Sequence, residues 1–477
     1  MRDSVLKFIF FLFVNLLVHL PFLNYPPCGT HVWRQCNTLA MSRNFATEDM
    51  NILQPRIDRR NETDGITGSH FPLYEWLLAL ISKVFGFSEM LARVYSLLIF
   101  SFVMLAMYLV LLQLKIKPFA AVCSALLLLS VPQMYYDSIN AMPDILALCF
   151  SLFALHFFLS YFLRAHAGFL FPAILFAVLG GLIKFQFLII PASSIAYIHF
   201  NRKQLFYAFV SIIFIVLPIF CWYSYAIQLT QVHNLKEFGL WIQPITWLQK
   251  WQTLWNNLIS DLPELLLGWP LFVFLIVFIS LNIKSFNRSR DQVFLWLWLL
   301  GFIVFYCVAI ERMMHHSYYF MAIIPACMIV CARCIQNQKQ FKTILVSLVL
   351  LNFMWSFARI IPSRWAENKM NVPSTFLDKN LRQELTSAIP EGASCVVGPD
   401  VSGCIYFYFT NTKGFSFERP DELLQMKVDG QYFEVMRHYG VKYLICNQGE
   451  RMRPVLEKLD KIRLKNTIGD FQIWELL

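Results

Sequence analysis

Residues 25–76 read YPPCGTHVWRQCNTLAMSRNFATEDMNILQPRIDRRNETDGITGSHFPLYEW. They form most of a polar segment, residues 24–87, that lies between two strongly apolar runs. The segment interleaves histidine, arginine and aspartate with tryptophan and other aromatic side chains. Cations gathered on one surface attract anionic partners. We therefore expect functional residues here, in contact with an anionic partner.

The composition of the whole chain is that of a membrane protein. Of its 477 residues, 57% are hydrophobic, only 15% are charged and 46 are phenylalanine, which lies outside the range of soluble domains. A bilayer core takes ~20 apolar residues per helical span, so the chain before Pro362 predicts about eleven spans. They are residues 5–23, 93–114, 118–134, 143–163, 168–185, 187–200, 205–227, 263–282, 293–310, 318–335 and 341–361. The expected fold is an all-α polytopic membrane bundle over residues 1–361.

The lysines and arginines predict how this bundle is oriented. In the short connections they fall in alternate loops, near residues 115–117, 164, 202–203, 284–290 and 339–342. The positive-inside rule assigns such loops to the cytoplasm. With an odd number of spans, the N-terminus is cytoplasmic, whereas residues 24–87 and the C-terminus lie outside. The first apolar run has no small-residue cleavage site, so we expect an uncleaved anchor.

Net charge and cysteine usage bear on partners and metals. The net charge of +10 is spread over the loops rather than gathered in one tail, which excludes nucleic acid as an expected partner. Cys28 with Cys36, and Cys395 with Cys404, lie on the oxidising side, and the sequence leaves both disulfides open. No recognisable metal-ligand spacing is present, so a divalent metal also stays an open question.

Two short helices are predicted within the polar segment. Residues 31–45 place apolar side chains on one side of a helix and polar ones elsewhere, which is typical of a helix on a membrane surface. Residues 73–85 form a second helical run that is too short to span. The stretch between them is rich in charge and in turn-forming residues.

The chain changes character after Pro362. Residues 362–477 carry charges at ordinary frequency, with strand-like runs at 394–397 and 405–409. The helix-like FEVMRHYG at 433–440 then leads into a buried strand at 443–446. We expect a small extracytoplasmic α/β domain. It has no glycine-rich phosphate loop or nucleophile elbow, which favours a cap or acceptor-docking module.

Ionisable residues inside apolar runs are the strongest functional signal. Asp144 follows Pro143 at the outer end of one run, Lys184 lies near the outer end of another, and HHSYY at 315–319 opens a third from outside. Charges within spans are costly, so they mark functional sites by default. Each also has a structural interpretation, as a helix N-terminal carboxylate, a snorkelling lysine or interfacial histidines. Their convergence on one membrane face favours the functional interpretation.

Six segments in this order resemble the GT-C glycosyltransferases, in particular the bacterial branch of protein O-mannosyltransferases and the lipid A aminoarabinose transferase. The segments are WRQCNTLAMSRNF, ILQPRID, FPLYEWLLALISKVFG, AMPDILAL, GGLIKFQFLIIP and HHSYYFMAIIPA. The resemblance covers residues 1–361. It implies transfer of a sugar from a polyprenyl-phosphate-linked donor to a lipid, glycan or protein acceptor, at the outer face of a bacterial inner membrane.

The chain departs from that family at one position. The family carries an acidic pair just after the first span, which serves as base or acceptor ligand. Here the corresponding residues, His31 to Gln35, include no carboxylate. The best substitute is Asp58, followed by His31, with Glu48 or Asp49 behind them.

The transfer reaction assigns roles to the remaining candidates. Breaking the bond between sugar and phosphate needs a base for the acceptor hydroxyl and cations for the leaving phosphate. The candidates for the base are Asp58 and Asp144. The candidates for phosphate binding are Arg34, Arg56, Lys184 and His316, with Tyr318 as a hydrogen-bond donor.

Two other functions compete with an enzyme. A transporter or flippase of lipid-linked glycan intermediates has the same composition, but would usually carry inverted repeats, and the sequence has no internal repeat. A non-catalytic member of the family is the third interpretation, and the missing acidic pair favours it.

Overall fold

The computed structural model describes residues 2–199, 202–233, 244–282, 290–314, 316–423, 436, 438–447, 449, 451–459 and 462–477. The chain divides into two compact units. The membrane unit comprises Met1–Asn24, Met90–Tyr225 and Trp241–Ser363. The loop–sheet unit comprises Tyr25–Glu89, Ala226–Leu240 and Arg364–Leu477.

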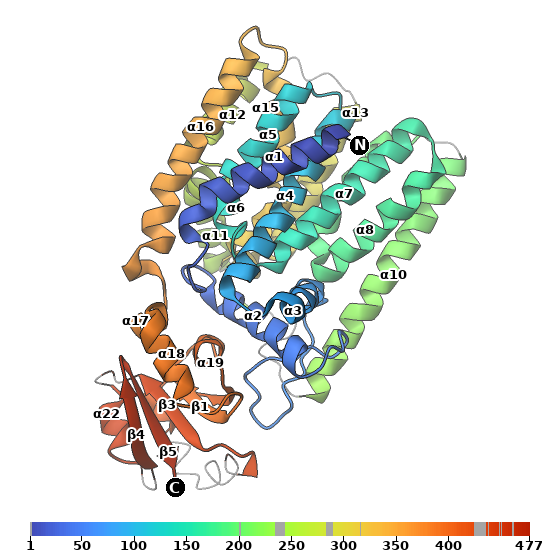
Figure 1. The fold of residues 1–477 in the computed structure, drawn as a ribbon. Helices are drawn as coiled ribbons and strands as arrows, with labels where there is room; N and C mark the ends of the chain where they lie inside the picture. The colour runs from blue at the N-terminus through green and yellow to red at the C-terminus, as the bar shows by residue number, and fades with distance from the viewer. Residues whose placement is uncertain are drawn as a thin grey trace. The chain divides into compact units, whose positions relative to one another are not determined.

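The membrane unit is helical (Figure 1). Its elements are α1 (Arg2–His19), η1 (Leu20–Phe22), α4 (Glu89–Gln113), α5 (Pro118–Ser130), α6 (Pro132–Asp137), α7 (Pro143–Arg164), η2 (Ala167–Phe169), α8 (Leu170–Ile183), η3 (Phe185–Leu188), α9 (Ile189–Ala192), η4 (Ser193–Tyr197), α10 (Arg202–Val232), α11 (Trp247–Asn256), η6 (Asn257–Leu266), α12 (Trp269–Asn282), α13 (Arg290–Val308), α14 (Ile310–Met313), η8 (Ser317–Ala322), α15 (Ile324–Ile335), α16 (Phe341–Ile360) and η9 (Ile361–Trp365).

The helices confirm a multi-pass membrane protein. Within the described residues, six helices are long and apolar enough to cross a membrane, namely α1 with η1, α4, α7, α10, α13 and α16 with η9. A bent pair, Trp247–Leu266 with Trp269–Phe278, adds a seventh if it counts as one span. Shorter apolar helices include α5 and α15, which fall below the length of a span. The expected number of about eleven spans therefore stays a prediction.

Two helix ends position the charged residues of this unit. Helix α7 begins at Pro143, where the missing N–H and preset φ suit a first helical turn, so Asp144 lies in that turn. Helix α8 ends at Ile183 because Lys184 adopts an extended backbone, with φ −152° and ψ 104°, before the chain continues as η3. Helices α7 and α8 run side by side (Figure 1). A Cβ on Gly180 would lie 2.6 Å from the Ser151 hydroxyl oxygen, so glycine permits this close approach.

The loop–sheet unit contains both helices predicted in the polar segment. They are α2 (Val32–Thr47) and α3 (Leu73–Phe85), which confirms both. Met41 and Phe45 of α2 pack with Ile57 and with Ala79 of α3 in a small apolar core. That core holds the intervening charged stretch against the two helices.

The C-terminal part of this unit is a small α/β structure. Its elements are η10 (Glu367–Lys369), α17 (Ser374–Leu377), α18 (Lys379–Ser387), β1 (Ser394–Gly398), α19 (Ile405–Thr410), β2 (Lys413–Ser416), β3 (Tyr443–Asn447), α22 (Arg453–Leu456), β4 (Ile462–Ile468) and β5 (Phe471–Leu476). In the described residues the strands form one sheet in the order β2-β1-β3-β5-β4. Strands β1, β2 and β3 are parallel, and β5 pairs antiparallel with both β3 and β4.

The strand predictions for this region meet different outcomes. Strands β1 and β3 confirm the predicted strands at 394–397 and 443–446. The strand predicted at 405–409 is wrong, because this segment forms helix α19. The Asp400 carboxylate accepts a hydrogen bond from the Tyr406 N–H, and the Ser402 hydroxyl accepts one from the Ile405 N–H, which starts a helix. Half of the predicted helix at 433–440, namely residues 433–435 and 437, lies outside the described residues.

The polar loop joins the edge of this sheet. The backbone N–H groups of Arg60 and Asn61 donate to the Gly414 carbonyl at 2.9 and 3.0 Å. In return, the Gly414 N–H donates to the Asp58 carbonyl at 3.0 Å. The loop thereby covers the otherwise open edge strand β2. The division between residues 361 and 362 stays a prediction, although the structure groups most of the loop with the C-terminal residues.

Candidate functional site

A buried carboxylate and a lysine face each other in the membrane unit. Asp144 is fully buried, and its Oδ1 atom lies 3.9 Å from the Lys184 Nζ atom. Within the described residues, neither carboxylate oxygen of Asp144 accepts a hydrogen bond. Burying a carboxylate without hydrogen bonds is costly, so Asp144 is not explained as a packing residue.

Aromatic rings and a second cation surround this pair. The Lys184 Nζ atom lies 5.3 Å from the ring centroid of Tyr319 and 5.7 Å from that of Tyr318. The Arg312 guanidinium donates to the Tyr319 hydroxyl at 3.4 Å. The His316 ring stacks on Tyr318, with 5.2 Å between centroids. We call Asp144, Lys184, Arg312, His316, Tyr318 and Tyr319 the membrane cluster.

The membrane cluster combines two cations with one carboxylate. Arg312 is always charged, and the Lys184 side chain retains only 12% of its exposure. A lysine and an arginine with tyrosine hydroxyls nearby can hold a phosphate, the arginine through paired N–H groups and the lysine as a point charge. The cluster therefore unites the predicted residues Asp144, Lys184, His316 and Tyr318. His315, the neighbour of His316, lies outside the described residues.

Asp58 has a different environment in the loop–sheet unit. Its Oδ2 accepts from Arg43 and its Oδ1 from Asn44, each at 2.8 Å, and the residue is 4% exposed. Both donors come from α2, and Arg43 also donates to the Tyr408 carbonyl at 3.3 Å. Asp58 therefore fixes the loop to α2, and this contact accounts for its burial. Its expected role as the base stays a prediction.

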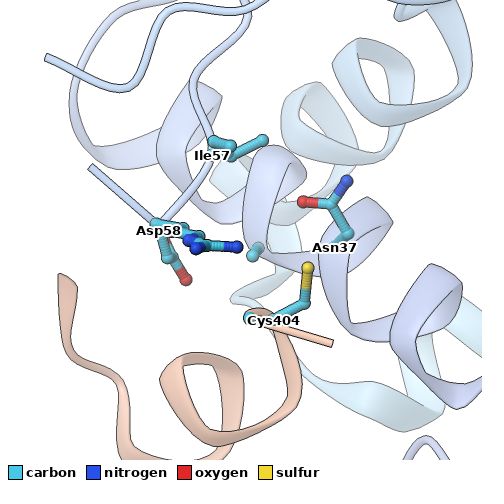
Figure 2. Close-up of a pocket in the computed structure, with 7 residues that line it drawn as sticks. Asn37, Ile57, Asp58 and Cys404 are labelled. Carbon is cyan, nitrogen blue, oxygen red and sulfur yellow. The ribbon is translucent and has the colours of Figure 1, made fainter. Parts of the chain in front are cut away.

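A narrow crevice lies beside Asp58. It is lined by Asn37, Ala40, Ile57, Asp58, Arg59, Gly403 and Cys404. Figure 2 shows the sulfur of Cys404 pointing toward Asn37 on α2. Burial raises the pKa of the Cys404 thiol well above its usual value, which disfavours the nucleophilic thiolate form.

The other predicted loop residues lie in separate contacts. The Arg56 guanidinium is 3.6 Å from the Asp49 carboxylate. His31 has a left-handed backbone, with φ 58°, and its carbonyl accepts the Arg34 N–H at the start of α2. The Arg34 guanidinium lies 3.5 Å from the His70 Nδ1 atom. The roles of His31, Arg34 and Arg56 in binding or catalysis stay predictions.

Sequence analysis missed a buried pair next to Arg34. The His70 Nε2 atom lies 2.9 Å from a carboxylate oxygen of Glu75, which is fully buried in the first turn of α3. Both residues belong to the quoted segment, in HFPLYEW. The available signal was a carboxylate in a helix that is otherwise apolar almost all round. Arg312 and Tyr319 were also missed as members of the membrane cluster.

Neither disulfide considered from the sequence is present, because the described Cys36, Cys395 and Cys404 carry free thiols. Cys395 lies within strand β1, whereas Cys404 precedes α19 and lines the crevice. No group of three or more potential metal-binding histidine, cysteine or acidic residues occurs within the described ranges. The structure thus supplies no candidate ligand set for the metal question.

Comparisons with known proteins place this geometry in a fold. A family described as dolichyl-phosphate-mannose-protein mannosyltransferase matches residues 69–223. The crystal structure of ArnT from Cupriavidus metallidurans in the apo state, a GT-C glycosyltransferase, superimposes with a TM-score of 0.69 at 11% identity, over 98% of this chain and 97% of that chain. The chain has the GT-C fold. This confirms the resemblance predicted from the sequence segments.

Further GT-C structures extend the comparison. ArnT from the same organism bound to undecaprenyl phosphate gives a TM-score of 0.68 at 12% identity, with 98% of each chain covered. The archaeal oligosaccharyltransferase AglB from Archaeoglobus fulgidus, in complex with an inhibitory peptide and a dolichol-phosphate, gives 0.55 at 12% identity, over 98% of this chain and 74% of that chain. No curated protein sequence matches the chain. The family match includes Asp144 and Lys184 but ends before Arg312.

Proposed function

We propose that this GT-C protein is a membrane glycosyltransferase that takes its sugar from a polyprenyl-phosphate-linked donor. The observation that carries the proposal is the membrane cluster, a buried carboxylate with two cations, in a chain whose fold matches a protein bound to undecaprenyl phosphate. The family matched by residues 69–223 is named for a lipid-phosphate sugar donor, which supports the same donor class. We place the reaction at the outer face of a bacterial inner membrane, with a cytoplasmic N-terminus.

The chemistry assigns the cations to the leaving group. The anomeric carbon–oxygen bond to phosphate breaks, and the phosphate oxygen keeps the electron pair. Lys184 and Arg312 stabilise the negative charge that develops there, since charged donors act most strongly in a desolvated site. The hydroxyl of Tyr319, already held by Arg312, adds a hydrogen-bond donor.

The acceptor side of the reaction needs a base. In our proposal the acceptor attacks the face of the sugar opposite the phosphate, which inverts the anomeric centre, and gives its proton to Asp144. Asp144 is favoured over Asp58 because its oxygens accept no hydrogen bond from a described residue, whereas both oxygens of Asp58 are engaged by α2. The acceptor is a lipid, a glycan or a protein that carries the attacking group.

The test is sugar transfer in proteoliposomes that contain the full chain, a labelled polyprenyl-phosphate sugar and a mixture of candidate lipid, glycan and protein acceptors. Release of polyprenyl phosphate is the readout. We expect Asp144→Asn and Lys184→Ala each to lower the rate about 100-fold or more. The matched control is Lys342→Ala, an exposed lysine that also lies over an aromatic ring, 5.8 Å from the Phe119 centroid, but outside the cluster. Its rate should match the wild-type rate.

Two results would contradict the proposal. Full activity of both Asp144→Asn and Lys184→Ala would show that the membrane cluster is not the active site. Donor lipid that crosses the bilayer with its sugar still attached would instead identify a flippase.

A further inference from the structure

Helix α11 carries a stripe of exposed tryptophans. It begins with a capping box, in which the Thr246 hydroxyl accepts the Gln249 N–H and the Gln249 side chain accepts the Thr246 N–H. Trp247, Trp251 and Trp255 follow at intervals of four residues and are 71%, 54% and 65% exposed. Residues four apart lie on the same face of a helix. The three rings therefore form one outward surface.

The opposite face of this helix is attached to the rest of the membrane unit. The Lys250 Nζ atom lies 3.1 Å from a carboxylate oxygen of Glu311. Thr253 is buried, and the Asn257 side-chain amide donates to the Tyr306 hydroxyl at 3.0 Å. The helix is thus held by its polar side, and this attachment turns the tryptophan face outward.

A sharp bend connects α11 and η6 to the apolar helix α12. The two segments meet at 110°, close to a right angle. The corner residue Gly268 has a φ of +83°, and a Cβ there would lie 2.4 Å from the Asn352 side-chain oxygen. The Asn352 amide donates to the Leu267 carbonyl at 3.1 Å, and the Trp355 indole donates to the Glu264 carbonyl at 3.1 Å. Two side chains of α16 therefore fix the corner.

The exposed apolar surface continues across this corner. Leu258 and Ile259 of η6 are each 52% exposed, and Val273, Ile276 and Val277 of α12 are each about half exposed. On an apolar helix of a membrane protein, such residues contact lipid. When α12 runs across the bilayer, α11 lies nearly parallel to the membrane plane.

We propose that α11 is an interfacial anchor, with Trp247, Trp251 and Trp255 inserted among the lipids at the boundary between headgroups and acyl chains. Tryptophan concentrates at that depth because its ring is apolar and its N–H seeks polar partners. A shallow hollow between Trp251 and Trp255 is edged by Gln252 and Asn256, whose amides can bond lipid headgroups. The partner is therefore the bilayer itself.

The anchor also connects the lipid surface to the membrane cluster. Glu311, which pairs with Lys250, precedes Arg312, and Arg312 donates to the Tyr319 hydroxyl beside Lys184. Lipid contact at α11 thereby helps position the donor phosphate site. This consequence, unlike the anchor itself, rests on the proposed function.

The test is fluorescence quenching by brominated phosphatidylcholine in nanodiscs that contain the full chain. The wild type is compared with the triple variant Trp247→Phe/Trp251→Phe/Trp255→Phe, and the difference gives the emission of the three tryptophans. We expect bromines near the glycerol to quench this emission at least about twofold, and bromines deep in the chains to quench it less. Phenylalanine keeps the face apolar, which preserves the fold. The readout requires no transferase activity.

The matched control is Trp296→Phe, because Trp296 is 67% exposed on α13. Its emission should be quenched more strongly by the deep bromines. Difference emission of the α11 tryptophans that neither bromine position quenches would overturn the proposal in favour of water or a protein partner. Stronger quenching by the deep bromines than by the shallow ones would also overturn it.

Discussion

At the scale of residues, burying the Asp144–Lys184 pair costs free energy of folding. The two atoms lie 3.9 Å apart, at the limit of an ion pair, and no described residue donates a hydrogen bond to the carboxylate. Replacing such a pair by apolar residues is often neutral or stabilising. A stability role therefore explains the pair poorly, whereas a phosphate that approaches Lys184 and an acceptor that approaches Asp144 would satisfy both groups.

The contacts of Asp58 predict a structural role. Asp58→Ala removes the carboxylate partner of the largely covered Arg43 guanidinium and should lower the free energy of unfolding by about 3 kcal/mol. The double variant Arg43→Met/Asp58→Ala should recover part of this loss, because no unpaired charge remains. Thermal unfolding in detergent measures both variants. If Asp58→Ala keeps the wild-type stability but loses sugar transfer, Asp58 is the base and our choice of Asp144 is wrong.

The ion pairs of the Glu48 carboxyl make the stability of the loop–sheet unit depend on pH. Burial raises the pKa of this carboxyl, but the hydrogen bond from Lys413 and the nearby Arg60 outweigh burial and hold the pKa below its ordinary value. A carboxyl with a lowered pKa stabilises the fold above its unfolded pKa, and the contribution disappears as the pH falls through the folded pKa. The loop should therefore loosen from β2 below about pH 4.5.

Hydrogen exchange of residues 48–61 between pH 6 and pH 3 measures this loosening. Glu48→Gln should exchange faster than the wild type at pH 6 and should depend less on pH. A wild-type loop whose exchange rate, divided by that of an unstructured peptide at the same pH, stays constant across the range would contradict the prediction.

The predictability of these residues follows from their surroundings. Asp144 and Lys184 could be found from sequence because charges stand out within apolar runs. Arg312 could not, because it lies in a short connection where charges are common. His70 and Glu75 pair only once the turn before α3 brings them together.

At the scale of elements, the ends of two helices position the charged residues of the membrane cluster: Asp144 lies in the first turn of α7, and Lys184 directly follows α8. Lys184 reaches the cluster because α8 stops at Ile183, and the apolar run itself gives no sign of that stop. Helix α2 was predictable from the spacing of its apolar residues, and α3 from an apolar run too short to span. Helix α19 was not, because all residues from Tyr406 to Thr410 are buried and show neither a helical nor a strand period.

The link between α11 and the membrane cluster predicts a kinetic effect at this scale. Glu311→Gln removes the charge that holds Lys250 and should lower kcat/KM for the lipid donor several-fold, because the next residue, Arg312, stabilises the leaving phosphate. Steady-state kinetics in proteoliposomes measure this ratio. The exposed pair Arg453–Glu457 in the loop–sheet unit supplies the control, since Glu457→Gln should leave the ratio unchanged. An unchanged kcat/KM in Glu311→Gln would contradict the link.

At the scale of the whole molecule, topology carries more information than sequence identity. The chain shares only 11–12% of its residues with ArnT, yet the alignment covers 98% of the chain. Hydropathy predicted the helical bundle because every span must bury its backbone bonds within itself. It did not predict that the polar loop completes the edge of the C-terminal sheet, because that contact is made by backbone groups of residues 58–61.

The central claim is sugar transfer from a polyprenyl-phosphate donor, and native mass spectrometry of the purified protein tests it most directly. The protein is incubated with the donor, and then with a mixture of candidate acceptors. We predict a complex with the intact donor that converts to a complex with polyprenyl phosphate, lighter by the mass of the sugar residue, once an acceptor is present. The Asp144→Asn variant should bind the donor without converting it. A wild-type protein that binds no donor, or keeps it intact with every class of acceptor, would contradict the account.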